Sequence, residues 1–119
     1  MKPPRPSNEI VRLIRAFGYA WNGLQAAMMQ PAFRLEVYGM LVLSPLAMWI
    51  TQSAIERILL IGSLFLVLIV EILNSAIETA IDRISLELHE LSGRAKDMAS
   101  GAVLLSLCNA AMVWVLILF

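Results

Sequence analysis

The uncharged run ILLIGSLFLVLIV (58–70) continues directly into EILNSAIETAID (71–82), with no turn residue at the junction. With its flanks, such a run is long enough to cross a bilayer as a helix. At about 100° per residue, the polar side chains of the second stretch share one helix face. They are termed the acidic ridge and are Glu71, Asn74, Glu78 and Asp82. Because an ionised carboxylate is costly in hydrocarbon, the ridge is expected to face a bundle interior or a site rather than lipid.

The depth of the acidic ridge suggests chemistry at the membrane boundary. If the helix enters near Ala54, a rise of about 1.5 Å per residue puts Glu71 about 26 Å in, near the far edge of a core of roughly 30 Å. Glu78 is then about 10 Å further out, in water. This arrangement suits a reaction between a lipid and a water-soluble reactant. The alternative is that the acids only pair with nearby basic residues at the membrane surface, which are Arg83, Arg94 and Lys96.

Composition indicates a membrane protein. The chain has 119 residues and 60% hydrophobic content, and its mean hydropathy is +0.78, which is too apolar for a soluble domain of this size. The formal net charge is zero, so no basic field suggests a nucleic-acid partner. We predict a single all-α membrane domain over the whole chain. Its parts are a flexible tail (1–7), an amphipathic surface helix (8–30) and three transmembrane helices (33–52, 54–86 and 94–119).

Local signals set these boundaries. Apolar residues recur at helical spacing from Ile10 to Met28, which is typical of a helix lying on a membrane surface. Gln30-Pro31 is expected to end or bend that helix, because the residue before proline is pushed out of the helical region. Ser92-Gly93 is the break predicted before the last helix.

The positive charges predict the orientation. Eight of the nine lysine and arginine residues lie before the first span or between the second and third, and Arg57 is the exception. By the positive-inside rule, the N-terminus and the acidic ridge face the cytoplasm, and the C-terminus faces the periplasm.

The residue types suit phosphoryl transfer. A carboxylate at head-group level can take a proton from a lipid hydroxyl, and a second carboxylate in water can hold Mg²⁺ on a nucleotide. Lys96, beside a helix N-terminus, can hold phosphate. His89 is the only histidine, which excludes a zinc cluster or a Ser-His-Asp arrangement within one chain. No Gly-rich nucleotide loop of the soluble kinases is present.

Four blocks of the chain resemble the integral-membrane diacylglycerol kinase family of bacteria. They are RLIRAFGYAWNGLQAA (12–27), AFRLE (32–36), VEILNSAIETAIDRI (70–84) and HELSGRAKDMASGAV (89–103). The last block resembles the diacylglycerol kinases of Gram-negative bacteria rather than the related undecaprenol kinases. The resemblance implies a homotrimer in the inner membrane with active sites shared between subunits. It also implies transfer of the γ-phosphate of MgATP to diacylglycerol, giving phosphatidic acid.

The resemblance also implies roles for individual residues. Glu71 would be the general base, and Glu78 would bind Mg²⁺. The residues implied to bind ATP are Arg12, Tyr19, Asn74, Glu78, Glu87, His89, Lys96 and Asp97. The residues implied to line the path of the lipid are Ala16, Trp21, Glu36, Trp49, Arg57, Glu71 and Ser100.

The chain departs from the family pattern at one place. Members usually carry a glutamate just before the AFR motif, and this glutamate is a ligand of the metal. This chain has Gln30-Pro31 there and is one residue shorter. Water, Gln30 or a shifted Glu36 could replace this ligand, since Mg²⁺ readily keeps waters. The alternatives left open are an undecaprenol kinase, a non-catalytic relative or membrane scaffold, and a small multidrug transporter. Three predicted spans rather than four argue against the transporter.

Overall fold

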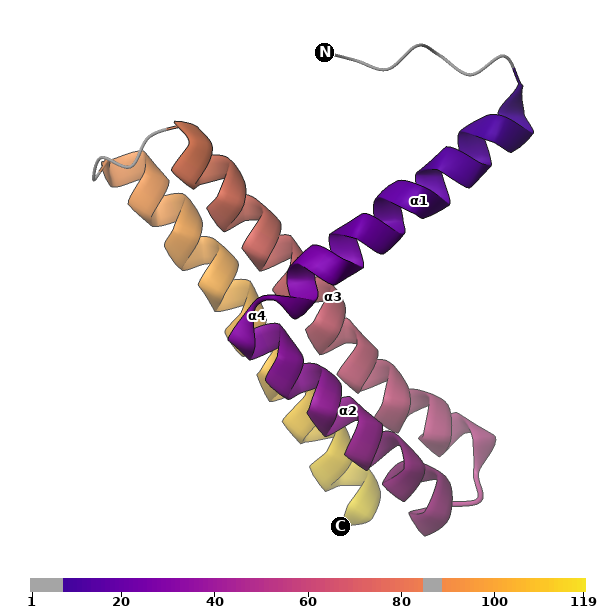
Figure 1. Cartoon of the computed structure of the whole chain (residues 1–119). Helices are drawn as coiled ribbons and strands as arrows, with labels where there is room; N and C mark the ends of the chain where they lie inside the picture. Colours follow the sequence, from indigo (N-terminus) through magenta and orange to yellow (C-terminus); the bar gives the residue numbers. More distant parts are fainter. Residues whose placement is uncertain (1–7, 85–88) are drawn as a thin grey trace.

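The structure, a computed structural model, describes residues 8–84 and 89–119. These residues form four helices, which are α1 (Glu9–Met28), α2 (Pro31–Ile50), α3 (Ala54–Ile84) and α4 (Glu90–Leu118) (Figure 1). The helices α2, α3 and α4 are long and apolar enough to cross a membrane. The prediction of an all-helical protein with three spans is therefore confirmed. The predicted tail 1–7 and Glu87 lie outside the described residues.

The helix α1 leaves the other three helices at its C-terminal end and projects away from them (Figure 1). It begins after Asn8, whose side-chain oxygen accepts a hydrogen bond of 2.8 Å from the Val11 N–H. Pro31 then opens α2, so this helix begins two residues earlier than the sequence analysis predicted. Proline suits this position because its fixed φ is helical and its missing N–H would have no partner there.

The helix α3 is the middle element of the bundle and packs against α2 on one side and α4 on the other (Figure 1). Leu60 of α3 and Ala47 of α2 are completely buried. Small residues on α4, such as Ala99 and Ala110, are also buried and allow a close approach of the helices. By contrast, Leu105 and Leu116 are each 72% exposed. So much exposed apolar surface fits a helical membrane protein.

Arg57 closes the turn between α2 and α3. Its Nε–H donates to the Thr51 carbonyl at 2.8 Å, and a terminal nitrogen donates to the Met48 carbonyl at 2.7 Å and to Gln52 Oε1 at 3.3 Å. Met48 lies in the last turn of α2, where carbonyl groups have no intrahelical partner. The Thr51 hydroxyl also donates to the Glu56 carboxylate. The guanidinium group therefore satisfies the end of one helix from the first turn of the next.

The predicted break at Ser92-Gly93 is wrong. The helix α4 begins at Glu90 and runs through both residues, so it also starts before residue 94. His89 caps the helix, because it is extended (φ −118°, ψ 137°) and its Nδ1 accepts a hydrogen bond of 3.1 Å from the Leu91 N–H. Glu90 is an acidic residue in the first turn, where a negative charge interacts favourably with the helix dipole. Glu90 also forms an ion pair with Arg94 at 3.4 Å. These local gains outweigh the cost of about 1 kcal/mol for a helical glycine.

The hydrogen bonds of Arg57 predict a stability effect. We expect Arg57→Lys to lower the free energy of unfolding by about 1–2 kcal/mol, because lysine keeps the charge but cannot make the forked set of bonds. Denaturant unfolding in detergent micelles measures this change. The control is Gln52→Ala, which removes only the 3.3 Å bond to Gln52. Equal stability of the lysine variant and the wild type would contradict the assigned role.

Candidate functional site

Burial along the acidic ridge falls from the membrane side to the end of α3. Glu71 is only 7% exposed, Asn74 and Glu78 are half-buried, and Asp82 is exposed. Glu71 and Glu78 are separated by about 10 Å along the helix axis. The innermost carboxylate is therefore enclosed by protein, and the outermost is open to solvent.

Asn74 and Glu78 form the polar centre of the ridge. The Asn74 amide nitrogen donates to Glu78 Oε1 at 3.3 Å. This bond leaves the Asn74 Oδ1 atom buried and without a hydrogen-bond partner among the residues that the structure describes. Buried oxygens without a partner are unusual in native proteins, and such an atom is suited to accept a water molecule or to bind an ion. An amide oxygen beside a carboxylate offers the hard oxygen ligands that Mg²⁺ prefers.

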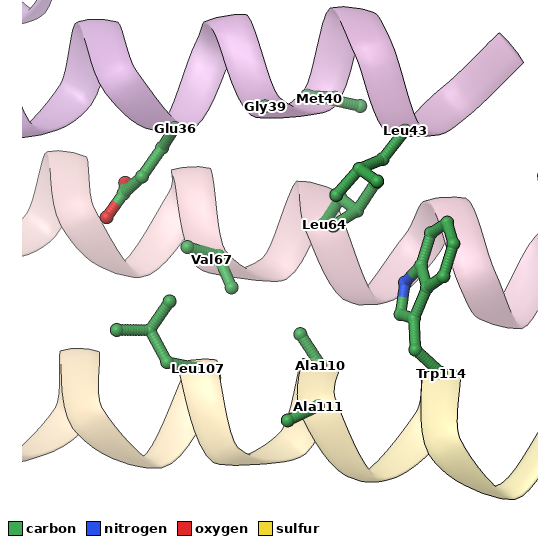
Figure 2. A pocket seen from close by; sticks show the side chains of 10 residues that line it. All are labelled: Glu36, Gly39, Met40, Leu43, Leu64, Val67, Leu107, Ala110, Ala111 and Trp114. Atoms are coloured by element: carbon green, nitrogen blue, oxygen red, sulfur yellow. The ribbon is translucent and has the colours of Figure 1, made fainter. Parts of the chain in front are cut away.

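Glu36 approaches the ridge from α2. Its side chain points from α2 toward α3 (Figure 2), close enough to Glu71 for their negative charges to repel. Its Oε2 atom is buried and has no hydrogen-bond partner within residues 8–84 and 89–119. Glu36 on α2 and Glu71 on α3 therefore interact electrostatically across the interface between these helices.

An apolar groove starts at Glu36 and runs between α2, α3 and α4. It has a volume of about 300 Å³ and is lined by aliphatic side chains such as Leu43, Leu64 and Val67, with Trp114 at its other end (Figure 2). The Trp114 indole N–H donates to the Leu60 carbonyl at 3.2 Å, which fixes the ring between α4 and α3. The sequence analysis did not single out the groove residues apart from Glu36, because their types do not differ from those of any spanning helix.

Lys96 and Asp82 connect α4 to α3 at the outer end of the ridge. The Lys96 Nζ atom lies 2.6 Å from Asp82 Oδ1. The negative charges of Asp82 and Glu78 both act on the ammonium group. The fold therefore brings the lysine implied to bind phosphate to the ridge.

Other residues named in the sequence analysis lie elsewhere. Arg12, Ala16 and Tyr19 are exposed on α1, which projects away from the bundle. Trp21 is also exposed, but it lines a hollow together with Phe33 of α2 and Leu68 of α3. Asp97 and Ser100 are exposed on α4, and His89 serves as its cap.

Trp49 and Arg57 lie at the opposite end of the bundle from the ridge. Trp49 is 79% exposed near the end of α2. Arg57 is in the first turn of α3, about 21 Å along the helix axis from Glu71. The chain does not bring these two residues together with the acidic ridge.

Gln30 lines a hollow of about 450 Å³ between α1 and α3, together with Ser75, Thr79 and Arg83. At about 100° per residue, Thr79 and Arg83 lie roughly 80° and 120° around α3 from Glu71, on a different helix face, and Ser75 lies between the two faces. Within the described part of the chain, no three His, Cys, Asp or Glu side chains gather as a metal cluster. A cation at the ridge would therefore take most of its ligands from water or from a bound substrate.

The fold and the site together define a class of protein, namely a helical membrane protein with a buried carboxylate, Glu71, followed along the same spanning helix by more exposed acidic residues. Comparison with known proteins is more specific. The model of the family described as prokaryotic diacylglycerol kinase matches residues 18–118.

Relatives named diacylglycerol kinase match most of the chain. One from Escherichia coli (strain K12) is 52% identical over 109 residues, which cover 91% of this chain and 89% of the relative. One from Haemophilus influenzae is 45% identical over a match that covers 92% of this chain and 94% of the relative. One from Pseudomonas aeruginosa is 43% identical over a match that covers 98% of this chain and 95% of the relative. The chain belongs to the prokaryotic diacylglycerol kinase family and is a lipid kinase.

Proposed function

We propose that the chain transfers the γ-phosphate of ATP to the hydroxyl group of diacylglycerol at the cytosolic face of the inner membrane, giving phosphatidic acid and ADP. The observation that carries this proposal is the buried Glu71, at the point where the uncharged part of α3 ends. The names of the relatives support diacylglycerol as the substrate.

Glu71 is the general base in this proposal. It accepts the proton of the lipid hydroxyl as the hydroxyl oxygen forms a bond to the γ-phosphorus. The bond from this phosphorus to the oxygen bridging the β- and γ-phosphates breaks, and ADP leaves with the bridging oxygen. In this proposal the Glu71 carboxylate lies at head-group level, where a lipid hydroxyl reaches it, and its burial between helices shields it from hydrocarbon.

Asn74 and Glu78 are the residues that would hold Mg²⁺. The buried Asn74 Oδ1 without a partner in the described residues and the adjacent Glu78 carboxylate fit a hard cation. When bound with ATP, the cation neutralises charge on the phosphates. Lys96 adds a positive charge to the same face of α3 and orients the phosphates. The other residues proposed to bind ATP are Arg12, Tyr19, Glu87, His89 and Asp97.

The groove between α2, α3 and α4 is proposed to take an acyl chain of the lipid. Its volume of about 300 Å³ and its aliphatic lining suit a hydrocarbon chain. Glu36 lines one end of the groove and interacts electrostatically with Glu71, so a lipid in the groove would present its hydroxyl group toward the base. The other residues proposed for the lipid are Ala16, Trp21, Trp49, Arg57 and Ser100.

A homotrimer would complete the site. The chain measures only 20 Å along its shortest axis, which is about two helix diameters. A body this thin cannot surround both a lipid and a nucleotide. The helix α1, which carries Arg12 and Tyr19, projects away from the other helices, so a neighbouring subunit is the natural recipient of these two exposed residues (Figure 1). This supports active sites shared between subunits.

The missing family glutamate leaves Glu78 as the single metal carboxylate. Gln30 lines the hollow with Arg83, on a different face of α3, so this side chain is not the replacement within its own chain. Water is therefore the proposed substitute, since Mg²⁺ keeps several waters in many sites.

Phosphate transfer tests the proposed function directly. In mixed micelles, the purified protein should transfer labelled phosphate from MgATP to diacylglycerol, and Glu71→Gln should lower kcat by about 100-fold or more, because the base is lost. Undecaprenol serves as the competing lipid. A higher kcat/KM for undecaprenol would reassign the substrate, and no transfer to either lipid by folded protein would favour the non-catalytic relative.

The metal site predicts a shift in Mg²⁺ dependence. We expect Asn74→Ala to raise the Mg²⁺ concentration for half-maximal activity about tenfold, because an oxygen ligand and the hydrogen bond that orients Glu78 are both removed. A Mg²⁺ titration at constant free ATP measures this. Thr79→Val is the control, since Thr79 lies on another face of α3 and its hydroxyl donates only to the Ser75 carbonyl, at 2.8 Å. An unchanged Mg²⁺ requirement in Asn74→Ala would contradict the assignment.

The groove predicts that a substitution in its lining changes KM for the lipid but not KM for ATP. Truncation by Trp114→Ala should raise KM for diacylglycerol about tenfold, as expected for the loss of a large apolar contact, and leave KM for ATP unchanged. Phe65→Ala is the matched control, because Phe65 is an aromatic residue of α3 that does not line the groove. Equal effects of the two substitutions would argue against the groove as a lipid site.

A further inference from the structure

We propose that Asp82 is a positioning residue for Lys96. It holds the Lys96 ammonium group at the acidic ridge when no nucleotide is present, and it gives up this group to the phosphates of an incoming nucleotide. This inference rests on the proposed function, because it assigns Lys96 to phosphate binding.

The geometry places the ammonium group where a nucleotide is needed. Lys96 belongs to the second turn of α4, and its Nζ atom reaches Asp82 on α3 at 2.6 Å. Asp82 is one helical turn beyond Glu78 on the same face. Both carboxylates act on the ammonium group, but the hydrogen bond goes to Asp82. The lysine is therefore held on the solvent side of Glu78, and the Glu78 carboxylate stays free to accept a cation.

The ion pair is not needed to hold α3 and α4 together. The two helices already pack through buried residues, such as Val67 on α3 and Ala99 on α4. The side chains of Lys96 and Asp82 are 40% and 50% exposed, and exposed ion pairs contribute little to stability. Such a contact is therefore easily exchanged for another.

A phosphate group can replace the Asp82 carboxylate without movement of the helices. Lysine is a flexible point charge with three donors, so rotation of its side chain is enough to redirect the ammonium group. Phosphate carries more negative charge than a carboxylate and offers more acceptor oxygens. The ion pair therefore orders Lys96 before binding, and this reduces the side-chain ordering that nucleotide binding requires.

The test compares Asp82→Asn with Glu90→Gln in the full-length protein in mixed micelles. Glu90 is the matched control, because it forms an ion pair with Arg94 in the first two turns of α4, away from the ridge. The first measurement is the rate at which an amine-acetylating reagent modifies Lys96, with and without MgADP. The second is KM for ATP and kcat with diacylglycerol. Asp82→Glu is included as the conservative variant.

The expected results separate positioning from a structural role. Without nucleotide, Asp82→Asn should raise the rate of Lys96 modification several-fold, and MgADP should protect Lys96 in the wild type. KM for ATP should rise about twofold to fivefold, the scale of an exposed ion pair that orders one side chain, while kcat changes by less than about twofold. Asp82→Glu should have a KM for ATP close to that of the wild type. Glu90→Gln should match the wild type in both KM and the rate of Lys96 modification.

Two different failures can be told apart. If the wild type transfers phosphate but Asp82→Asn leaves both KM and the reactivity of Lys96 unchanged, the positioning role is overturned and the proposed function stands. If the wild type transfers no phosphate to any lipid, the proposed function fails. Protection of Lys96 by MgADP in the wild type then decides whether the lysine binds nucleotide. If Asp82→Asn does not fold, Asp82→Ala decides the question, because it also removes the carboxylate, and an unchanged KM together with unchanged Lys96 reactivity would overturn the proposal.

Discussion

The free-energy cost of an ionised carboxylate in hydrocarbon constrains the whole molecule. The helix α3 carries no charge from Ile58 to Val70, and its first acidic side chain after this run, Glu71, is buried between helices. The next charges, Glu78 and Asp82, follow at helical spacing and become progressively more exposed. The acidic side chains in the second half of α3 therefore share one helix face, and their exposure rises along it.

The other helices are arranged around this face. The helix α2 directs a second carboxylate, Glu36, toward α3 (Figure 2). The helix α4 brings Lys96 to Asp82 at the outer end of the ridge. The apolar groove runs from Glu36 toward the opposite end of the bundle. At that opposite end, the hydrogen bonds of Arg57 hold α2 and α3 in register. The acidic ridge and Lys96 thus lie at one end of the bundle, and the hydrogen bonds of Arg57 lie at the other.

The sequence predicted the spans and the acidic ridge because both depend on periodicity and charge along a single helix. It failed at the start of α4, where Ser92-Gly93 looked like a break. The His89 cap and the acidic first turn outweigh that signal, and neither feature is a strong predictor of a helix start from sequence alone. The groove could not be predicted, because its lining comes from three helices whose mutual rotation is set by packing. The pairing of Lys96 with Asp82 likewise depends on how α3 and α4 face each other.

The central claim is that the ridge crosses the boundary between lipid and cytosol. Single cysteines placed along α3, in a Cys108→Ala background, test it by labelling with a membrane-impermeant maleimide added to the cytosolic side. Positions 79 and 83, on the solvent-exposed part of α3, should label rapidly, whereas positions 59, 66 and 69 in the uncharged run should not. Rapid labelling at positions 79 and 83 only from the periplasmic side, or equal labelling along the whole helix, would contradict the account.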